Sequence, residues 1–270
     1  MTTRTFLARL CAGGLLAASL LLAPLAHAGR SCEAKPLGVQ SLTRGLALAE
    51  RTQAALDASG ASVVVLARAG QDLGKYQLRY SHLGFAYKQP DGAGGYVWRV
   101  LHKLNDCGSA VAVVYRQGLG DFFLDDLWRF EAAWAVPTPD VQSRLLAVLQ
   151  DTARATALHQ RPYSLVSYAW GQTYQQSNQW AIETLAMAVE PGINTRQKAQ
   201  AWLQFKGYEP TALKLGPLTR LGGRVSAANV AFDDHPNEKR FSDRIETVTV
   251  DSVFAWLVRA QLATAPEVLR

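Results

Sequence analysis

The stretch YSHLGFAYKQPDGAGGYVWRVLHKL, residues 80–104, decides how this chain folds. Its two halves are rich in aromatic and β-branched residues, and they flank the turn sequence QPDGAGG at residues 89–95. Runs of this kind on either side of a Pro- and Gly-rich turn are typical of a β-hairpin. The sequence therefore predicts two antiparallel strands, at 80–88 and 96–104.

Two histidines lie within these predicted strands. If the turn is centred on Gly92, residues paired across the hairpin have numbers that sum to 184, so His82 faces His102 directly. Gly84 then lies opposite Val100 on the same face, and its missing side chain leaves space beside the His82 ring. Such a pair suits a base with its orienting partner, a pair of metal ligands, or two histidines without a chemical role.

Outside the hairpin, predicted strands come first and predicted helices later. This order is typical of an α+β fold in which an antiparallel sheet is packed against helices. A short Val-rich apolar run predicts a strand at 62–68, and further strands are predicted at 110–115, 129–136 and 245–250, with a loop at 119–126. Helices are predicted at 39–58, 140–158, 178–189, 196–206 and 252–260, the last capped by Asp251.

The first 28 residues have the features of a secretory signal peptide. Arg4 and Arg9 precede an apolar run, and the tripeptide Ala-His-Ala at 26–28 has the small-x-small pattern of a cleavage site. The run is too short to span a membrane, and no later stretch reaches the ~20 apolar residues that a span needs. We therefore expect an exported, periplasmic protein without a transmembrane segment after cleavage, in which residues 29–270 form a single domain.

Composition and charge exclude further classes of protein. Hydrophobic residues make up 49% of the chain and charged residues 19%, which excludes a disordered polyelectrolyte. The formal net charge is +6, but no run of Lys and Arg is interleaved with aromatic residues, so we expect no nucleic-acid partner. The segment 118–120 lacks the phosphate-loop pattern, and no cofactor is expected. A substrate in the cell envelope or cell wall fits an exported protein.

Cys32 and Cys107 are the two cysteines of the predicted mature chain. An even count in an oxidising compartment favours a disulfide between them. Two alternatives stay open: Cys107 as a reactive nucleophile within NDCG, and two free buried thiols.

The polar segment YQQSNQW, residues 174–180, opens a predicted helix. Ser177 is the N-cap or a first-turn residue, and capping is the ordinary role of a serine there. Its hydroxyl also lies beside free backbone N–H groups and the positive end of the helix dipole, which suits a nucleophile whose oxyanion is held by amides near Asn178. Such a serine needs a base to be activated.

The segment DDHP at 233–236, followed by Glu238, groups carboxylates with an imidazole. Such a group suits a metal ion, either alone or together with His82 and His102, whereas an Asx-type turn is the ordinary interpretation of the loop. No ligand spacing enforces a metal site, so we assign no metal ligand.

Several of these motifs resemble known families. SHLGFAY at 81–87 looks like the His strand of NlpC-type papain-like hydrolases, and WRVLH at 98–102 is similar to their next strand, which supplies the third member of a Cys–His–His site. In the circularly permuted branch a nucleophile helix follows, and SNQW at 177–180 takes its place. Nearly the whole mature chain also resembles a bacterial family of unknown function, number 2145 in the domain-of-unknown-function series, in YSH at 80–82, LNDCG at 104–108, SNQW at 177–180 and NVAFDDHP at 229–236.

The resemblance implies a permuted papain-like topology and a hydrolase or acyltransferase that acts on amide or ester bonds of an envelope substrate. Ser177 would replace the Cys as nucleophile, His82 would be its base, and His102 would orient His82. Because an oxygen nucleophile is weaker than a thiolate, two other expectations stand beside this one. They are a non-catalytic periplasmic binding or assembly protein on a degenerate papain-like scaffold, and a metal-dependent hydrolase.

Overall fold

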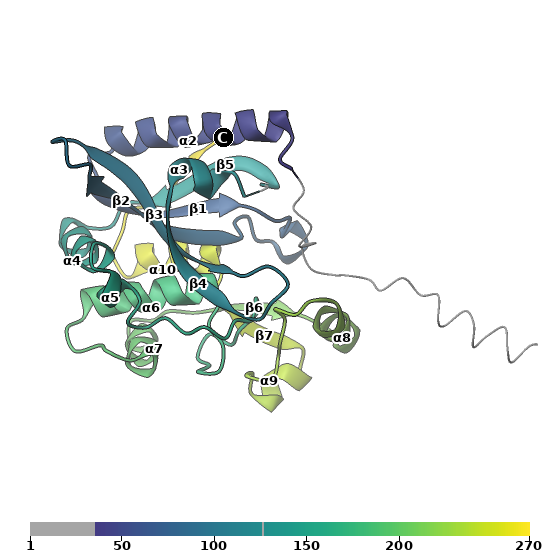
Figure 1. The fold of residues 1–270 in the computed structure, drawn as a ribbon. Helices are drawn as coiled ribbons and strands as arrows, with labels where there is room; N and C mark the ends of the chain where they lie inside the picture. Colours follow the sequence, from purple (N-terminus) through teal and green to yellow (C-terminus); the bar gives the residue numbers. More distant parts are fainter. Residues whose placement is uncertain (1–35, 126) are drawn as a thin grey trace, which may run out of the picture.

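The computed structural model describes residues 36–125 and 127–270, which form a six-stranded sheet between two layers of helices (Figure 1). The sheet is antiparallel, with the strand order β4-β3-β2-β1-β5-β8. Its strands are β1 (Val63–Ala69), β2 (His82–Pro90), β3 (Tyr96–Asn105), β4 (Ala112–Gly118), β5 (Arg129–Ala135) and β8 (Glu267–Leu269).

Helices cover both faces of this sheet (Figure 1). One face carries α2 (Val39–Ala58) and α3 (Leu119–Phe123), and the other carries α4 (Pro139–Leu149), α6 (Ser177–Val189) and α10 (Val250–Arg259). A second sheet pairs β6 (Thr211–Lys214) with β7 (Arg244–Thr247). The remaining elements are the 3₁₀ turn η1 (Gly74–Tyr76) and the helices α5 (Thr152–Ala155), α7 (Arg196–Phe205), α8 (Pro217–Ser226) and α9 (Asn237–Phe241).

This architecture confirms the predicted fold class, an α+β protein with an antiparallel sheet packed against helices. The permuted papain-like topology stays a prediction. Within the described parts of the chain, no helix has both the length and the apolar character needed to cross a membrane.

Several element boundaries differ from the prediction, because local hydrogen bonds begin or end a helix there. The predicted helix 140–158 is divided, because the Asp151 carboxylate accepts hydrogen bonds from two backbone amides and begins α5. Asp251 is not the cap of α10. The Thr249 hydroxyl accepts the Ser252 amide and caps this helix, which cuts the predicted strand 245–250 short at Thr247. The predicted loop 119–126 contains the short helix α3.

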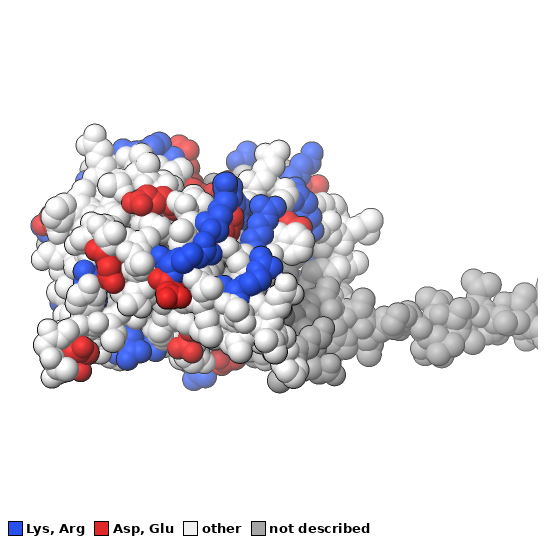
Figure 2. All heavy atoms as spheres, turned by 90° about the horizontal axis from the view of Figure 1, so that it is seen from above, with Lys and Arg blue, Asp and Glu red and all other residues white. Residues whose placement is uncertain are grey.

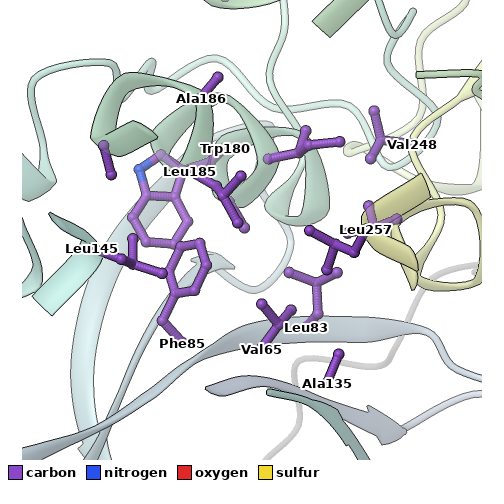
Figure 3. Close-up of a cluster of buried hydrophobic side chains, with 14 of the residues drawn as sticks. Val65, Leu83, Phe85, Ala135, Leu145, Trp180, Leu185, Ala186, Val248 and Leu257 are labelled. Carbon is purple, nitrogen blue, oxygen red and sulfur yellow. The ribbon is translucent and has the colours of Figure 1, made fainter. Parts of the chain in front are cut away.

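Side chains that alternate along the central strands divide the core in two. Phe85 of β2 faces α6, where its ring meets Trp180 at a centroid distance of 6.0 Å (Figure 3). The next residue, Ala86, faces the opposite way and packs with Leu48 of α2 and Phe122 of α3. Successive residues of β2 therefore belong to different layers of the molecule.

The β2–β3 hairpin forms as predicted, but its register differs by two. Phe85 pairs with Leu101 and Pro90 with Tyr96, so paired numbers sum to 186. The reason is a loop of five residues, closed because the Asp91 carboxylate accepts the backbone amides of Ala93 and Gly95.

The new register changes the partners of the motif residues. His82 is not directly opposite His102, and Gly84 is not opposite Val100: Gly84 lies opposite His102 itself. A Cβ atom at position 84 would stand 2.8 Å from the His102 Cβ and 3.0 Å from the Leu101 carbonyl oxygen. Because an error of two residues preserves the alternation, His82 and His102 still share one face, as a diagonal pair.

The close approach at position 84 predicts that Gly84→Ala destabilises the protein by about 1–3 kcal/mol, because the added methyl group overlaps a Cβ and a backbone oxygen. Urea unfolding measures the effect. Gly222→Ala is the matched control, since a Cβ at 222 meets nothing within 4 Å. Equal unfolding midpoints for Gly84→Ala and the unaltered protein would show that the contact is not tight.

Candidate functional site

The two histidines of the hairpin form the centre of the candidate site. His82 Nε2 lies 2.8 Å from His102 Nδ1, and the ring planes are 69° apart. The contact spans the diagonal of the strand pair, and the missing side chain of Gly84 makes room for it. The predicted meeting of the two imidazoles is therefore confirmed, although the predicted directly opposed pairing is wrong.

Gln117 of β4 fixes the direction of this hydrogen-bond chain. Its Oε1 lies 2.7 Å from His102 Nε2 and can only accept a hydrogen bond, so His102 Nε2 carries a proton. In a neutral ring His102 Nδ1 is then an acceptor, and His82 must donate from Nε2. His82 Nδ1 is thereby left as a bare lone pair, the form that a general base requires.

The surroundings keep both rings neutral. Burial is the main cause that lowers the pKa of His82 well below 6.5, and the Arg68 charge lowers it further. Burial followed by the Arg68 charge lowers the pKa of His102 to about 4. Both imidazoles are thus neutral at neutral pH, each with a single N–H, as the hydrogen-bond chain demands.

Helix α3 forms one wall of the site. The Phe122 ring lies 5.9 Å from the His82 ring and 5.2 Å from the His102 ring, measured between centroids. Arg68 holds this wall in place, because it donates to the Phe122 carbonyl, pairs with Asp125 and stacks over the Phe122 ring at 4.7 Å. The predicted loop 119–126 therefore supplies part of the site.

Ser177 is the first residue of α6, on the other side of the sheet from the two imidazoles. Its neighbour is the phenol of Tyr163. Burial raises the pKa of this phenol, and a hydrogen bond with Ser177 acts in the opposite direction. Ser177 does not cap the helix: Gln176 is the N-cap residue, and its Oε1 accepts the Asn178 amide at 3.0 Å. No hydrogen bond joins Ser177 to His82 in the described part of the chain.

Asn178 links the start of α6 to the strand that carries His82. Its Oδ1 accepts the backbone amide of Leu83 at 3.0 Å. The first turn of α6 therefore contacts β2 at the residue after His82. The Asn178 amide, predicted as an oxyanion donor, already bonds to its own helix cap.

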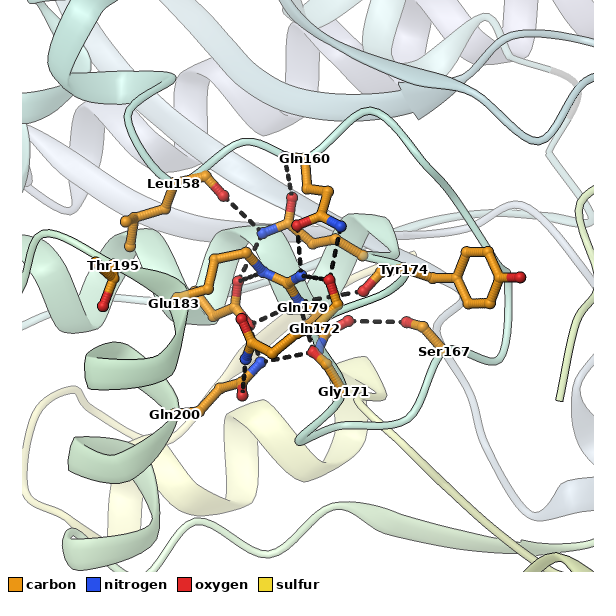
Figure 4. Close-up of polar contacts among 12 residues, drawn as sticks. Leu158, Gln160, Ser167, Gly171, Gln172, Tyr174, Gln179, Glu183, Thr195 and Gln200 are labelled. Atoms are coloured by element: carbon orange, nitrogen blue, oxygen red, sulfur yellow. Dashed lines mark hydrogen bonds and ion pairs between the residues drawn. The ribbon is translucent and has the colours of Figure 1, made fainter. Parts of the chain in front are cut away.

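A buried polar network beside α6 was not predicted (Figure 4). The Glu183 carboxylate is fully buried and accepts hydrogen bonds from Arg196, Gln200 and Gln175. Gln175 Oε1 in turn accepts from Lys103 Nζ at 2.9 Å. Burial, followed by the Arg196 charge, lowers the pKa of Lys103 to about 7. This network ties β3 to α6 and α7.

Sequence reasoning missed this network because its members read as surface residues. The consecutive polar residues at 175–179 resemble a solvated helix start, and only contacts with distant segments bury them. One signal was available: Glu183 falls among the apolar residues of the α6 pattern, and a buried carboxylate needs a cation.

The segment 233–236 forms a separate cluster. His235 Nδ1 lies 3.0 Å from Asp234 Oδ1, and the other oxygen of Asp234 accepts the Tyr168 amide. Asp233 lies near the Tyr174 hydroxyl. Within residues 36–125 and 127–270, no three His, Cys, Asp or Glu side chains are grouped as metal ligands. The hypothetical metal site that joins this segment to His82 and His102 therefore does not form there.

The leader and Cys32 lie outside the described residues. Cleavage after residue 28 and the Cys32–Cys107 disulfide consequently stay predictions. Cys107 itself lies in the turn that follows β3.

Comparison with known protein families identifies a match over most of the chain. The model of the family described as "Uncharacterized protein conserved in bacteria (DUF2145)" matches residues 55–257, which include both histidines, Ser177 and the 233–236 segment. No curated protein and no solved structure matches the chain.

The buried histidines predict a pH dependence of stability. His82 and His102 stay neutral in the folded protein below pH 6.5, whereas the unfolded chain binds protons there, so stability should fall from pH 6.5 to about 4. Each such histidine contributes at most about 1.4 kcal/mol per pH unit. Urea unfolding at several pH values measures the slope, which His102→Gln should make shallower. The same slope in both proteins would contradict this assignment.

Proposed function

The chain belongs to this uncharacterized bacterial family, and we propose that it is an exported hydrolase or acyltransferase that acts on amide or ester bonds of an envelope substrate. His82 is the general base, and His102 orients it. The observation that carries the proposal is the His82–His102–Gln117 chain, which leaves a lone pair on His82 Nδ1.

A histidine oriented in this way suits acyl transfer for a physical reason. When His82 takes a proton at Nδ1, its Nε2–H still donates to neutral His102, so the ring keeps its orientation and no second proton transfer is needed. Because the pKa of both rings is lowered, His82 is neutral before the reaction and its Nδ1 is free to accept a proton. A positioned base contributes about 10²–10⁴-fold to a reaction rate.

Ser177 is the nucleophile in this proposal. Its oxygen attacks the acyl carbon while His82 takes its proton, and that proton then passes to the leaving amine or alcohol. Water, or a second acceptor, releases the acyl group by the same sequence in reverse. In the structure Ser177 lies beside Tyr163, on the other face of the sheet from His82. The step therefore requires the Ser177 hydroxyl to reach His82 Nδ1 around the start of β2. The Asn178–Leu83 bond places the helix start next to the residue that follows His82, so the route has to pass this end of β2.

A periplasmic substrate is proposed from residues 1–28 alone. The order of Arg residues, apolar run and Ala-His-Ala favours export, and the cell envelope is the chemistry that an exported protein meets.

A second candidate function is a non-catalytic binding or assembly protein. Two observations favour it: Ser177 makes no hydrogen bond to His82, and the Asn178 amide is occupied by Gln176 Oε1. In this case the His82–His102–Gln117 chain is a structural element that satisfies buried polar groups.

The first functional prediction concerns reactivity. A serine-reactive fluorophosphonate probe should label the protein, and hydrolysis of a chromogenic ester should fall about 10²–10⁴-fold in Ser177→Ala and in His82→Ala. The double variant should lose no more, because the two residues act as a unit. His102→Ala should keep residual activity.

Ser242→Ala, at an exposed serine outside the site, is the matched control and should react normally. Labelling that survives Ser177→Ala would remove Ser177 from the mechanism. A folded protein with neither labelling nor hydrolysis would favour the binding protein.

The second functional prediction concerns export. Intact-mass analysis of periplasmic protein should give a chain that begins at Gly29, because cleavage follows the Ala-His-Ala signature. Peptide mapping without reductant should recover Cys32 and Cys107 in one linked species. A soluble cytoplasmic protein that retains residues 1–28 would contradict both expectations.

A further inference from the structure

Helix α8 exposes an apolar stripe to solvent. None of its ten residues is buried. Leu218, Leu221 and Val225 are 84%, 59% and 80% exposed. These are among the most exposed large apolar side chains of the described residues, and they lie on one short helix. Among the described residues, no other element covers this stripe.

The three side chains lie close together around the helix axis. At about 100° per residue, positions 218, 221 and 225 fall within an arc of roughly 60°. Helices that pack into a protein core or groove usually bury an arc of about 100° or more. A narrow stripe is better suited to an interface that buries only one side of the helix, and that side only to a shallow depth.

The sequence segment that carries the stripe contains cations and no acids. Residues 211–230 contain Lys214, Arg220 and Arg224, with no Asp or Glu. The face that carries α2 differs, because Asp and Glu side chains lie among its Lys and Arg side chains (Figure 2). The α8 segment is thus a place where positive charge and exposed apolar surface coincide.

The helix is fixed to the protein with its stripe outward. Arg220 donates to the Leu215 carbonyl and, at 2.5 Å, to Asp243, next to β7. Leu215 also donates its amide to the Asp243 carbonyl oxygen. These bonds orient α8 on the β6–β7 sheet and leave Lys214 and Arg224 exposed.

We propose that α8 docks the protein onto an anionic lipid surface, with Leu218, Leu221 and Val225 in the headgroup region and Lys214 and Arg224 on lipid phosphates. Anionic headgroups complement the uncompensated cations, and a short amphipathic helix binds such a surface in its plane. Because one short helix buries little apolar area, binding is reversible and weakens with salt. The proposal does not depend on the reaction assigned to His82.

Flotation with vesicles tests the proposal, using protein made from the complete chain with its N-terminus identified by mass. The protein should float with vesicles that contain phosphatidylglycerol and not with phosphatidylcholine alone, and high salt should release it. Leu218→Ser/Leu221→Ser/Val225→Ser should abolish flotation. Arg224→Gln should lower the partition coefficient about fivefold, the value of one surface charge.

Phe205→Ser and Arg154→Gln are matched controls, because Phe205 is 82% exposed on α7 and Arg154 is exposed on α5. Both should float like the unaltered protein. Failure of the unaltered protein to float, or normal flotation of the triple variant, would overturn the proposal. A dimer that the triple variant dissociates, without flotation, would instead assign the stripe to contact between two copies.

Discussion

The alternation of side chains along β2 is the constraint on which the rest of the structure depends. A strand sends successive residues to opposite faces, so Leu83 and Phe85 join the layer of α6 while His82 and Gly84 join the layer of α3. The imidazole pair and the first turn of α6 are consequently placed on two sides of one strand. Any chemistry that uses both the imidazole pair and the first turn of α6 has to occur at the start of β2, where Asn178 contacts Leu83.

Much of this arrangement could be predicted from local patterns. The aromatic and β-branched runs and the glycine-rich turn predicted the hairpin, and the 39–58 periodicity predicted α2 with both ends correct. The register could not be read, because QPDGAGG can close in more than one way and the Asp91 side chain selects the five-residue loop. The shared face of His82 and His102 survived this error, since a shift of two residues preserves side-chain parity.

The parts that sequence reasoning missed share another cause. Gln117, Phe122 and Arg68 complete the histidine site from β4, α3 and β1, and their place beside the imidazoles follows only from strand order and helix packing. The Arg196 partner of Glu183 follows likewise only from the packing of α7 on α6, although the position of Glu183 among apolar residues was a signal for a buried ion pair. Buried ions of this kind contribute little net stability, yet removal of one partner costs about 3–5 kcal/mol, so the network favours one arrangement of α6 and α7 over others.

Residues 102 and 103 connect the two polar assemblies. His102 points toward α3 and joins the imidazole chain, whereas Lys103 points toward α6 and donates to Gln175, two residues before Ser177. Because the two residues are adjacent in one strand, a displacement of β3 moves both assemblies together. The Asn178–Leu83 bond couples β2 to the same helix start. Both strands of the hairpin are thus tied to the N-terminal half of α6 by these two hydrogen bonds and by the packing of Phe85 on Trp180, and no hydrogen bond joins His82 to Ser177 among the described residues.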